Sequence, residues 1–248
     1  MRLRTRALWL PKAGHRAAEY EDACCPTRSK KRWAAEFRCA VADGATEASF
    51  SGLWARMLVQ SFCSGEIGAR SLSGDLTAIQ RAWHLEVEGK QLPWYAEEKL
   101  RLGAFSSLLG FTMHPEGRDR WEAMAVGDSC LFQVREGELC TAFPLASSDD
   151  FDNRPNLISS MPIANDRLES FVSVAEGECF TGDSFYLMTD ALASWFLREW
   201  EEGGRPWSTL DAFASRSGLA RFAGWISELR DSRRIRNDDV TLLGVRME

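Results

Sequence analysis

The chain has 248 residues, of which 45% are hydrophobic and 27% charged, a balance typical of a globular protein with a sizeable core. Its formal net charge of −6 argues against a nucleic-acid-binding protein, because the phosphate backbone requires a basic face. The seven cysteines are scattered without a C-x-x-C pair, which favours reduced thiols in a cytoplasmic protein over a zinc site.

The first 35 residues hold two features that bear on localisation and partners. Residues 7–11 form only a short apolar stretch after three arginines, too short for a signal-peptide core or a membrane span, so we expect no membrane association. A basic run follows and predicts a solvated loop, with a nucleic-acid contact as the less favoured alternative. The run comprises Arg28, Lys30, Lys31 and Arg32.

The next segment predicts a strand, a turn and two helices. Residues 36–44 alternate and then become apolar before Asp-Gly, which indicates a buried strand that ends in a tight turn. Apolar positions at helical spacing predict a helix over 47–63 that packs on a sheet. Residues 75–102 are charged and helical in pattern, with a break near Pro93.

The second half of the chain predicts strands on both sides of helices. Strands are expected at 104–112, 121–133 (interrupted at 127–129), 170–175, 184–189 and 239–246, and helices at 191–201 and 207–229. The polar stretch 144–169 predicts a long surface loop of the kind that often carries function. Because the β-α-β alternation of a parallel sheet is missing, the pattern favours an α+β layered domain.

Three aspartates stand at the ends of predicted buried strands, namely Asp43, Asp190 and Asp238. Each one alone is most simply a solvated turn residue. Together, at the ends of strands of one domain, they are expected to converge, and converging carboxylates repel unless a cation neutralises them. Hard oxygen ligands select Mg²⁺ or Mn²⁺ over zinc.

Five short motifs occur in a fixed order along the chain. They are EDA (21–23), VADGATE (41–47), GDS (127–129), TD (189–190) and DDVTLLGV (238–245). Each is common alone, but the series resembles that of the type 2C metal-dependent Ser/Thr protein phosphatases. The segment GAFSSLLGF (103–111) also resembles the small-hydroxyl strand that precedes GDS in that family.

This resemblance implies a fold and a metal centre. It implies one phosphatase domain over residues 1–248, a four-layer α-β-β-α sandwich of two antiparallel sheets flanked by helices. It also implies two Mg²⁺ or Mn²⁺ ions, with a third, accessory position in some members, and a bridging water that attacks phosphorus. By position, the matching metal-site residues are Asp43, Gly44, Asp190 and Asp238, with Glu21 and Asp22 acting partly through water and Asp128 at the accessory position.

The chain departs from the family pattern around the substrate. Ala17 stands where the family places a phosphate-binding arginine, so Arg16, Lys12 or His15 is expected to take that role. Ser194 replaces an aspartate that often follows the TDG motif, which removes an accessory metal ligand. The other departures are Ala45 in place of His or Met after Asp-Gly, and Ala191 in place of the TDG glycine.

The expected function is hydrolysis of phosphoserine or phosphothreonine in proteins, in partnership with a Ser/Thr kinase system. The alternative is a catalytically weak or inactive phosphatase-like module that binds a signalling partner. Manganese-dependent hydrolysis of p-nitrophenyl phosphate separates the two.

Overall fold

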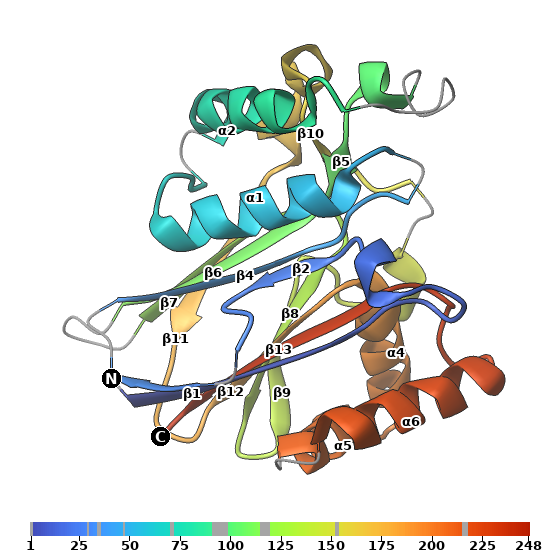
Figure 1. Ribbon diagram of the computed structural model, residues 1–248. Helices are drawn as coiled ribbons and strands as arrows, with labels where there is room; N and C mark the ends of the chain where they lie inside the picture. Colours follow the sequence, from blue (N-terminus) through green and yellow to red (C-terminus); the bar gives the residue numbers. More distant parts are fainter. Residues whose placement is uncertain are drawn as a thin grey trace.

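Two antiparallel sheets pack face to face with helices on both outer sides (Figure 1). The protein is seen here in a computed structural model that describes residues 2–28, 30–33, 36–46, 48–69, 72–90, 99–114, 120–151, 154–214 and 218–248. The expected α+β sandwich of four layers is confirmed. No helix in these described ranges is long and apolar enough to cross a membrane.

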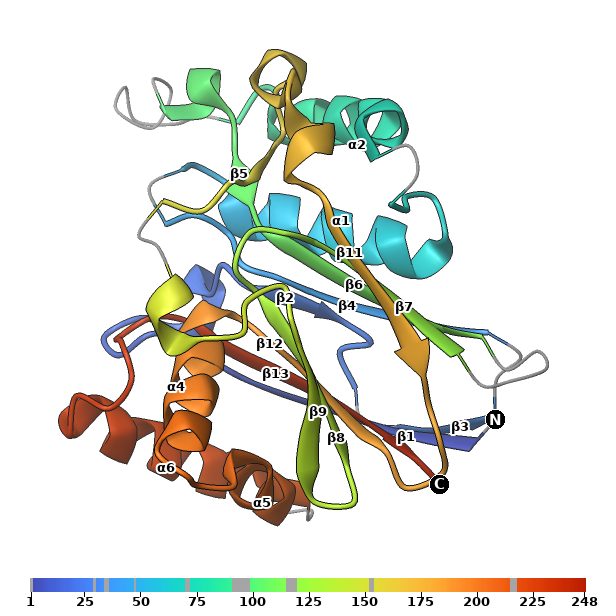
Figure 2. The same cartoon turned by 180° about the vertical axis from the view of Figure 1, so that it is seen from behind.

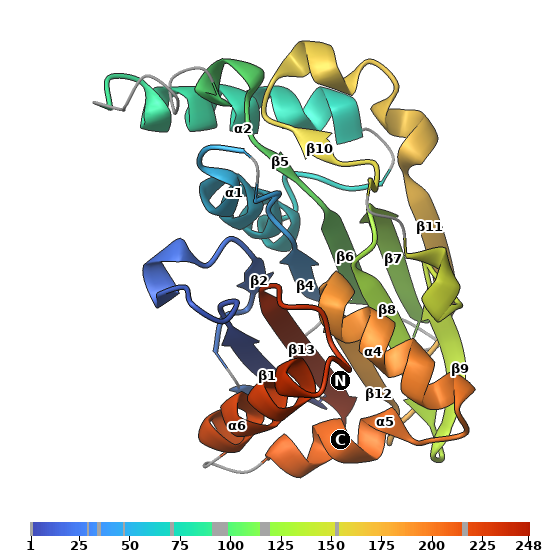
Figure 3. The same ribbon diagram turned by 90° about the vertical axis from the view of Figure 1, so that its right-hand side faces the viewer.

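The first sheet contains six strands in the order β3-β1-β13-β12-β8-β9. The helices α4, α5 and α6 cover its outer face (Figure 3). The strands are β1 (Arg2–Leu10), β3 (Lys30–Trp33), β8 (Cys130–Arg135), β9 (Glu138–Phe143), β12 (Ser184–Met188) and β13 (Val240–Met247), and the helices are α4 (Asp190–Glu201), α5 (Pro206–Asp211) and α6 (Gly218–Asp231).

The second sheet contains five strands in the order β11-β7-β6-β4-β2, with α1 and α2 on its outer side (Figure 2). Its strands are β2 (Ala23–Cys25), β4 (Phe37–Ala42), β6 (Leu108–His114), β7 (Arg120–Val126) and β11 (Ser173–Glu178). The helices are α1 (Ser51–Ser64) and α2 (Leu72–Val87), and a small pair, β5 (Phe105–Ser106) and β10 (Ile158–Ser159), lies beside them.

The period-2 alternation of the strands explains the layers. On β12, Phe185 and Leu187 belong to the core between the sheets, whereas Tyr186 and Met188 belong to the core under α4 and α6. On β4, Cys39 and Val41 face the core between the sheets, while Ala40 and Ala42 face α1. Each central strand is buried on both sides, so each sheet needs a helical layer over its outer face.

Several expectations about the elements are corrected. The helix expected at 207–229 is divided into α5 and α6, with a 3-10 turn at Ala212–Ala214. The basic run at 28–32 is not wholly loop, because Lys30–Trp33 pairs with the start of β1. The expected loop 144–169 contains 3-10 turns and β10. Strands β1 and β2 were missed, and the expected break near Pro93 lies outside the described residues.

A candidate metal centre at the ends of the sheets

Asp43 follows the last residue of β4, and its backbone is held on both sides by serines from the β5–β6 segment. Its carbonyl oxygen accepts a hydrogen bond from the Ser106 hydroxyl at 2.8 Å, and another from the Ser107 backbone N–H at 2.8 Å. Its N–H donates to the Ser107 hydroxyl at 3.0 Å. The small-hydroxyl strand noted in the sequence therefore fixes the direction of the Asp43 side chain.

Two glycines permit close approach of the surrounding backbone. A Cβ on Gly44 would lie 2.6 Å from the carbonyl oxygen of Glu21 and 2.9 Å from the carbonyl carbon of Ser51. Gly127 has φ +98°, and a Cβ there would lie 2.6 Å from the Ser107 Cβ. Only glycine fits at either position without displacing backbone or a buried side chain. The Asp-Gly and Gly-Asp-Ser motifs thus have a packing basis in this chain.

The carboxylates of Asp43, Asp128 and Asp190 converge, with one oxygen from each lying within 4.8 Å of the others. They come from three different places: the end of β4, the turn between β7 and β8, and the first residue of α4. Asp128 and Asp190 are buried, and Asp43 is half-buried. Three carboxylates at this separation repel strongly unless they are protonated or hold a cation.

Asp22 adds a fourth acidic group to the cluster. Its Oδ2 accepts hydrogen bonds from the hydroxyls of Thr189 at 2.9 Å and Thr241 at 2.7 Å. Its Oδ1 is buried and has no hydrogen-bond donor among the residues that the structure describes. Burial raises the pKa of Asp22 to about 8, with neighbouring Asp239 adding to the effect. A carboxylate oxygen left in this state is what a cation or a proton would satisfy.

The pKa of Asp43 is shifted in the same direction as that of Asp22. Its burial raises its pKa well above the ordinary range, and the charges of Asp22, Asp128 and Asp238 raise it further. Strong perturbation by burial and like charge is a mark of functional sites. Asp238 is not one of the three converging carboxylates, and it affects Asp43 through its charge.

Asp238 reaches the cluster through an arginine that the sequence analysis did not single out. The Arg236 guanidinium contacts the Asp190 carboxylate, and its Nε lies 3.6 Å from Oδ2 of Asp238. Asp238 is therefore separated from Asp190 by the width of one guanidinium group. The arginine supplies the positive charge that these two carboxylates require here.

Asp239, also missed from the sequence, fixes the N-terminal acidic pair. Its carboxylate accepts hydrogen bonds from the backbone N–H of Lys12 at 2.8 Å and of Glu21 at 2.6 Å. The Glu21 side chain turns to the Ser51 hydroxyl at 2.7 Å. No sequence pattern marked this role, because Asp239 ties the start of the chain to its end.

The three candidate phosphate-binding cations differ in position. The Lys12 ammonium lies 3.6 Å from the Glu21 carboxylate and donates to the Thr46 hydroxyl at 3.1 Å, beside the Asp-Gly turn. His15 and Arg16 are exposed. The segment around them is irregular, with a turn at Gly14 and a 3-10 helix at Ala17–Glu19, as an inward-facing Arg16 would require.

The family model for protein phosphatase 2C matches residues 14–231, which is most of the chain and includes Asp43, Asp128 and Asp190. The chain belongs to the protein phosphatase 2C family. The match ends before Asp238, so the last motif is supported by its place in the fold alone. Among curated proteins no match was found.

Solved structures share the phosphatase 2C fold at low sequence identity. The Mycobacterium tuberculosis serine/threonine phosphatase PstP/Ppp is 19% identical, with a TM-score of 0.62 over 100% of both chains. The catalytic domain of PstP in complex with two manganese ions is 17% identical, with a TM-score of 0.55 over 99% of this chain and 100% of that one. PppA, a regulatory component of a Pseudomonas aeruginosa secretion system, is 17% identical, with a TM-score of 0.51 over 98% and 97%.

The cluster fits a hard divalent cation of the kind that the phosphatase 2C family uses. Converging carboxylates and a buried carboxylate oxygen without a donor provide oxygen ligands only, which select Mg²⁺ or Mn²⁺. No cysteine or histidine is part of the converging set in the described ranges.

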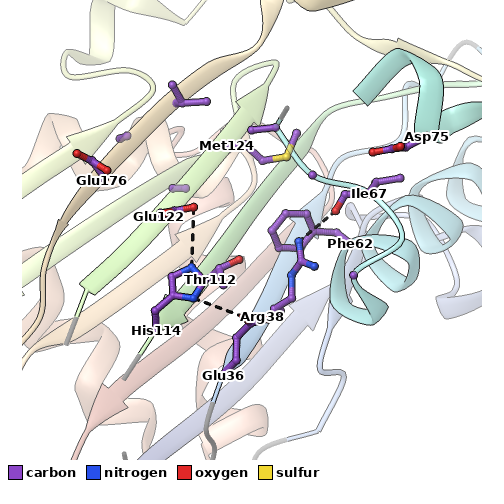
Figure 4. A pocket seen from close by; sticks show the side chains of 16 residues that line it. Glu36, Arg38, Phe62, Ile67, Asp75, Thr112, His114, Glu122, Met124 and Glu176 are labelled. Atoms are coloured by element: carbon purple, nitrogen blue, oxygen red, sulfur yellow. Dashed lines mark hydrogen bonds and ion pairs between the residues drawn. The ribbon is translucent and has the colours of Figure 1, made fainter. Parts of the chain in front are cut away.

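A large cavity lies elsewhere, at the open end of the second sheet near α1 (Figure 4). Its volume is about 780 Å³, and it shares no residue with the acidic cluster. His114 stands there between Glu36 at 3.4 Å and Glu122 at 3.8 Å, and Arg38 lies over the Phe62 ring. Size alone is therefore a poor guide to the chemistry of this fold.

Proposed function

We propose that this phosphatase 2C family member is a metal-dependent phosphomonoester hydrolase that removes phosphate from phosphoserine or phosphothreonine in proteins. The observation that carries the proposal is the convergence of Asp43, Asp128 and Asp190 within 4.8 Å, together with the raised pKa of Asp43. The whole chain, residues 1–248, acts as one domain in this proposal, in the cytoplasm and opposite a Ser/Thr kinase.

The metal ligands in this proposal are Asp43, the Gly44 carbonyl, Asp190 and Asp238, with Asp128 at an accessory position. Glu21 and Asp22 would act partly through bound water. Two Mg²⁺ or Mn²⁺ ions would supply an activated water as nucleophile and charge stabilisation on the phosphoryl oxygens. No protein nucleophile is needed for in-line attack.

The chain's own contribution is to hold these carboxylates in place before metal or substrate arrives. Ser106 and Ser107 fix the Asp43 backbone, and the hydroxyls of Thr189 and Thr241 fix Asp22. Among the three cations proposed for the phosphate, Lys12 has the best support, because it already lies beside Glu21 and Thr46. An ammonium there can neutralise a phosphoryl oxygen as a point charge.

The test is phosphate release from a phosphothreonine peptide with Mn²⁺ or with excess chelator. We expect turnover only with metal. Asp190→Asn removes one carboxylate charge at nearly constant volume, and we expect it to lower kcat by roughly 100-fold or more while the fold is retained. Asp231→Asn, at the exposed end of α6, is the matched control and should behave as the wild type.

Two results would reject the enzyme. Turnover that persists in chelator would exclude a metal-dependent reaction. Mn²⁺ binding without turnover of either the peptide or p-nitrophenyl phosphate would favour the regulatory module that binds a signalling partner, an alternative for which the Arg236 bridge between two metal ligands is the supporting observation.

A further inference from the structure

A second, basic pocket adjoins the candidate metal centre and shares Asp190 with it. The pocket has a volume of about 240 Å³ and lies between α4, the turn at Ser148 and the segment before β13. Three arginines line it, at positions 198, 234 and 236, and Asp190 is the single carboxylate residue in its lining. Trp195 and Phe151 provide apolar walls.

The three arginines differ in the ion pairs that they already form. Arg234 pairs with Glu199, and Arg236 bridges Asp190 and Asp238. Among the described residues Arg198 forms no direct ion pair, and its guanidinium donates two long hydrogen bonds, each of 3.4 Å, to the Arg234 carbonyl and the Ser194 hydroxyl. An exposed guanidinium at a pocket wall, without a direct ion pair to a described residue, can bind an anion, although its charge also acts on Glu201 in the next turn.

The pocket wall is pre-formed on the loop side. The Glu201 carboxylate accepts hydrogen bonds from the Ser148 backbone N–H at 2.8 Å, from its hydroxyl at 2.5 Å and from the Ser147 hydroxyl at 3.0 Å. These bonds attach the turn to α4 and, with the charge of Arg198, lower the pKa of Glu201, so its carboxylate stays ionised beside the pocket. Of the three guanidinium groups in the lining, Arg234 is paired with Glu199, and Arg236 with Asp190 and Asp238, so Arg198 is the one left to bind a ligand.

Metal binding would release a second guanidinium, that of Arg236. If Asp190 and Asp238 held a divalent cation, Arg236 would lose its role as their counter-charge and its guanidinium would be free to turn toward the pocket. Ser194 contributes to the same outcome, since an aspartate at this position would be a hydrogen-bond distance from Arg198 and would neutralise it.

We infer that this pocket binds an acidic side chain of the phosphoprotein substrate, a few residues away from the phosphoresidue. The inference rests on the proposed function and names its substrate class: phosphosites with a nearby glutamate or aspartate. Arg198 lies eight residues after Asp190 on α4, which is about 12 Å along the helix axis. An extended peptide covers about 3.3–3.6 Å per residue, so the acidic residue lies about three or four positions from the phosphoresidue.

The test compares phosphothreonine peptides that differ only at these positions. One pair carries Glu or Gln three and four residues before the phosphothreonine, and a second pair carries them after it. We expect one Glu peptide to be preferred over its Gln partner by roughly fivefold in kcat/KM, which is the effect of one partly exposed ion pair. This preference should become smaller at high salt. Arg198→Gln should reduce the preference to near unity, and Arg198→Lys should retain part of it.

Binding separates this inference from the enzyme proposal. Fluorescence anisotropy with the same peptides and Mn²⁺ measures the preference even if nothing is hydrolysed, so a Glu preference that depends on Arg198 would stand without turnover. Arg221→Gln removes an equal charge outside the pocket and should keep the preference. Equal binding of the Glu and Gln peptides in both pairs, or a preference unaffected by Arg198→Gln, would overturn the inference.

Discussion

The metal-free protein disfavours the ionised form of Asp22, because its carboxyl group is buried near other acids. Burial raises its pKa from 3.8 to about 8, so between these values the unfolded chain releases a proton that the folded chain retains. The contribution to stability is full below the ordinary carboxyl pKa and is lost as the pH rises toward 8. We therefore expect the free energy of unfolding of the metal-free protein to fall from pH 5 to pH 8.

The variant Asp22→Asn tests this dependence. It keeps an acceptor for Thr189 and Thr241 but cannot ionise, so chemical denaturation at several pH values should show a shallower fall than in the wild type. Some slope should remain, because the pKa of Asp43 is also raised. Asp166→Asn, at an exposed position, is the control. A wild-type slope in Asp22→Asn would show that Asp22 is ionised in the folded protein.

The packing of α1 on the second sheet depends on Gly110 of β6, which leaves room for the Phe62 ring. A Cβ at Gly110 would lie 2.3 Å from the Phe62 ring, which is buried beneath α1 and covered by Arg38. Gly110→Ala should therefore destabilise the protein by about 1–3 kcal/mol, as overpacking of a core does. Thermal or urea unfolding measures the change.

The matched control is Gly74→Ala on α2. A Cβ there meets nothing within 4 Å, and the glycine is helical and exposed. This substitution should stabilise the protein by about 0.5–1 kcal/mol through the lower entropy of the unfolded chain. Equal effects of the two substitutions would show that the Phe62 ring moves aside without cost.

Periodicity predicted the elements that pack on one face and failed where tertiary contacts decide. The alternation before Asp43 gave β4, and the helical spacing around Trp54 gave α1. The same spacing suggested one helix over 207–229, because apolar positions continue through the turn at Ala212–Ala214 that separates α5 from α6. Strand β1 was missed, since the arginines among its residues interrupt its apolar pattern.

The residues of the acidic cluster likewise fall into those that sequence motifs predicted and those that only tertiary contacts reveal. Motif order indicated Asp43, Asp128 and Asp190, which the fold brings together. Asp239 contacts Glu21, which is 218 positions away in the sequence, and Arg236 contacts Asp190, which is 46 positions away. No local sequence pattern marks such contacts. Residues whose role depends on a partner far along the chain become visible only when the sheets are assembled.

For the whole molecule, the two sheets matter because each contributes part of the cluster. Asp43 comes from the second sheet, Asp190 and Asp238 come from the first, and Asp128 lies on the turn that joins a strand of each. Anything that binds the cluster therefore binds both sheets at once, and it stabilises the folded chain by mass action. The basic pocket beside α4 lies on the first-sheet side of this junction.

The most direct test is a crystal structure of the protein grown with Mn²⁺ and recorded at an energy where manganese scatters anomalously. We predict anomalous peaks between Asp43, Asp190 and Asp238, roughly 2.1 Å from their carboxylate oxygens, with Arg236 withdrawn from Asp190. A cluster without anomalous density at saturating Mn²⁺, with Arg236 still bridging Asp190 and Asp238, would contradict the account.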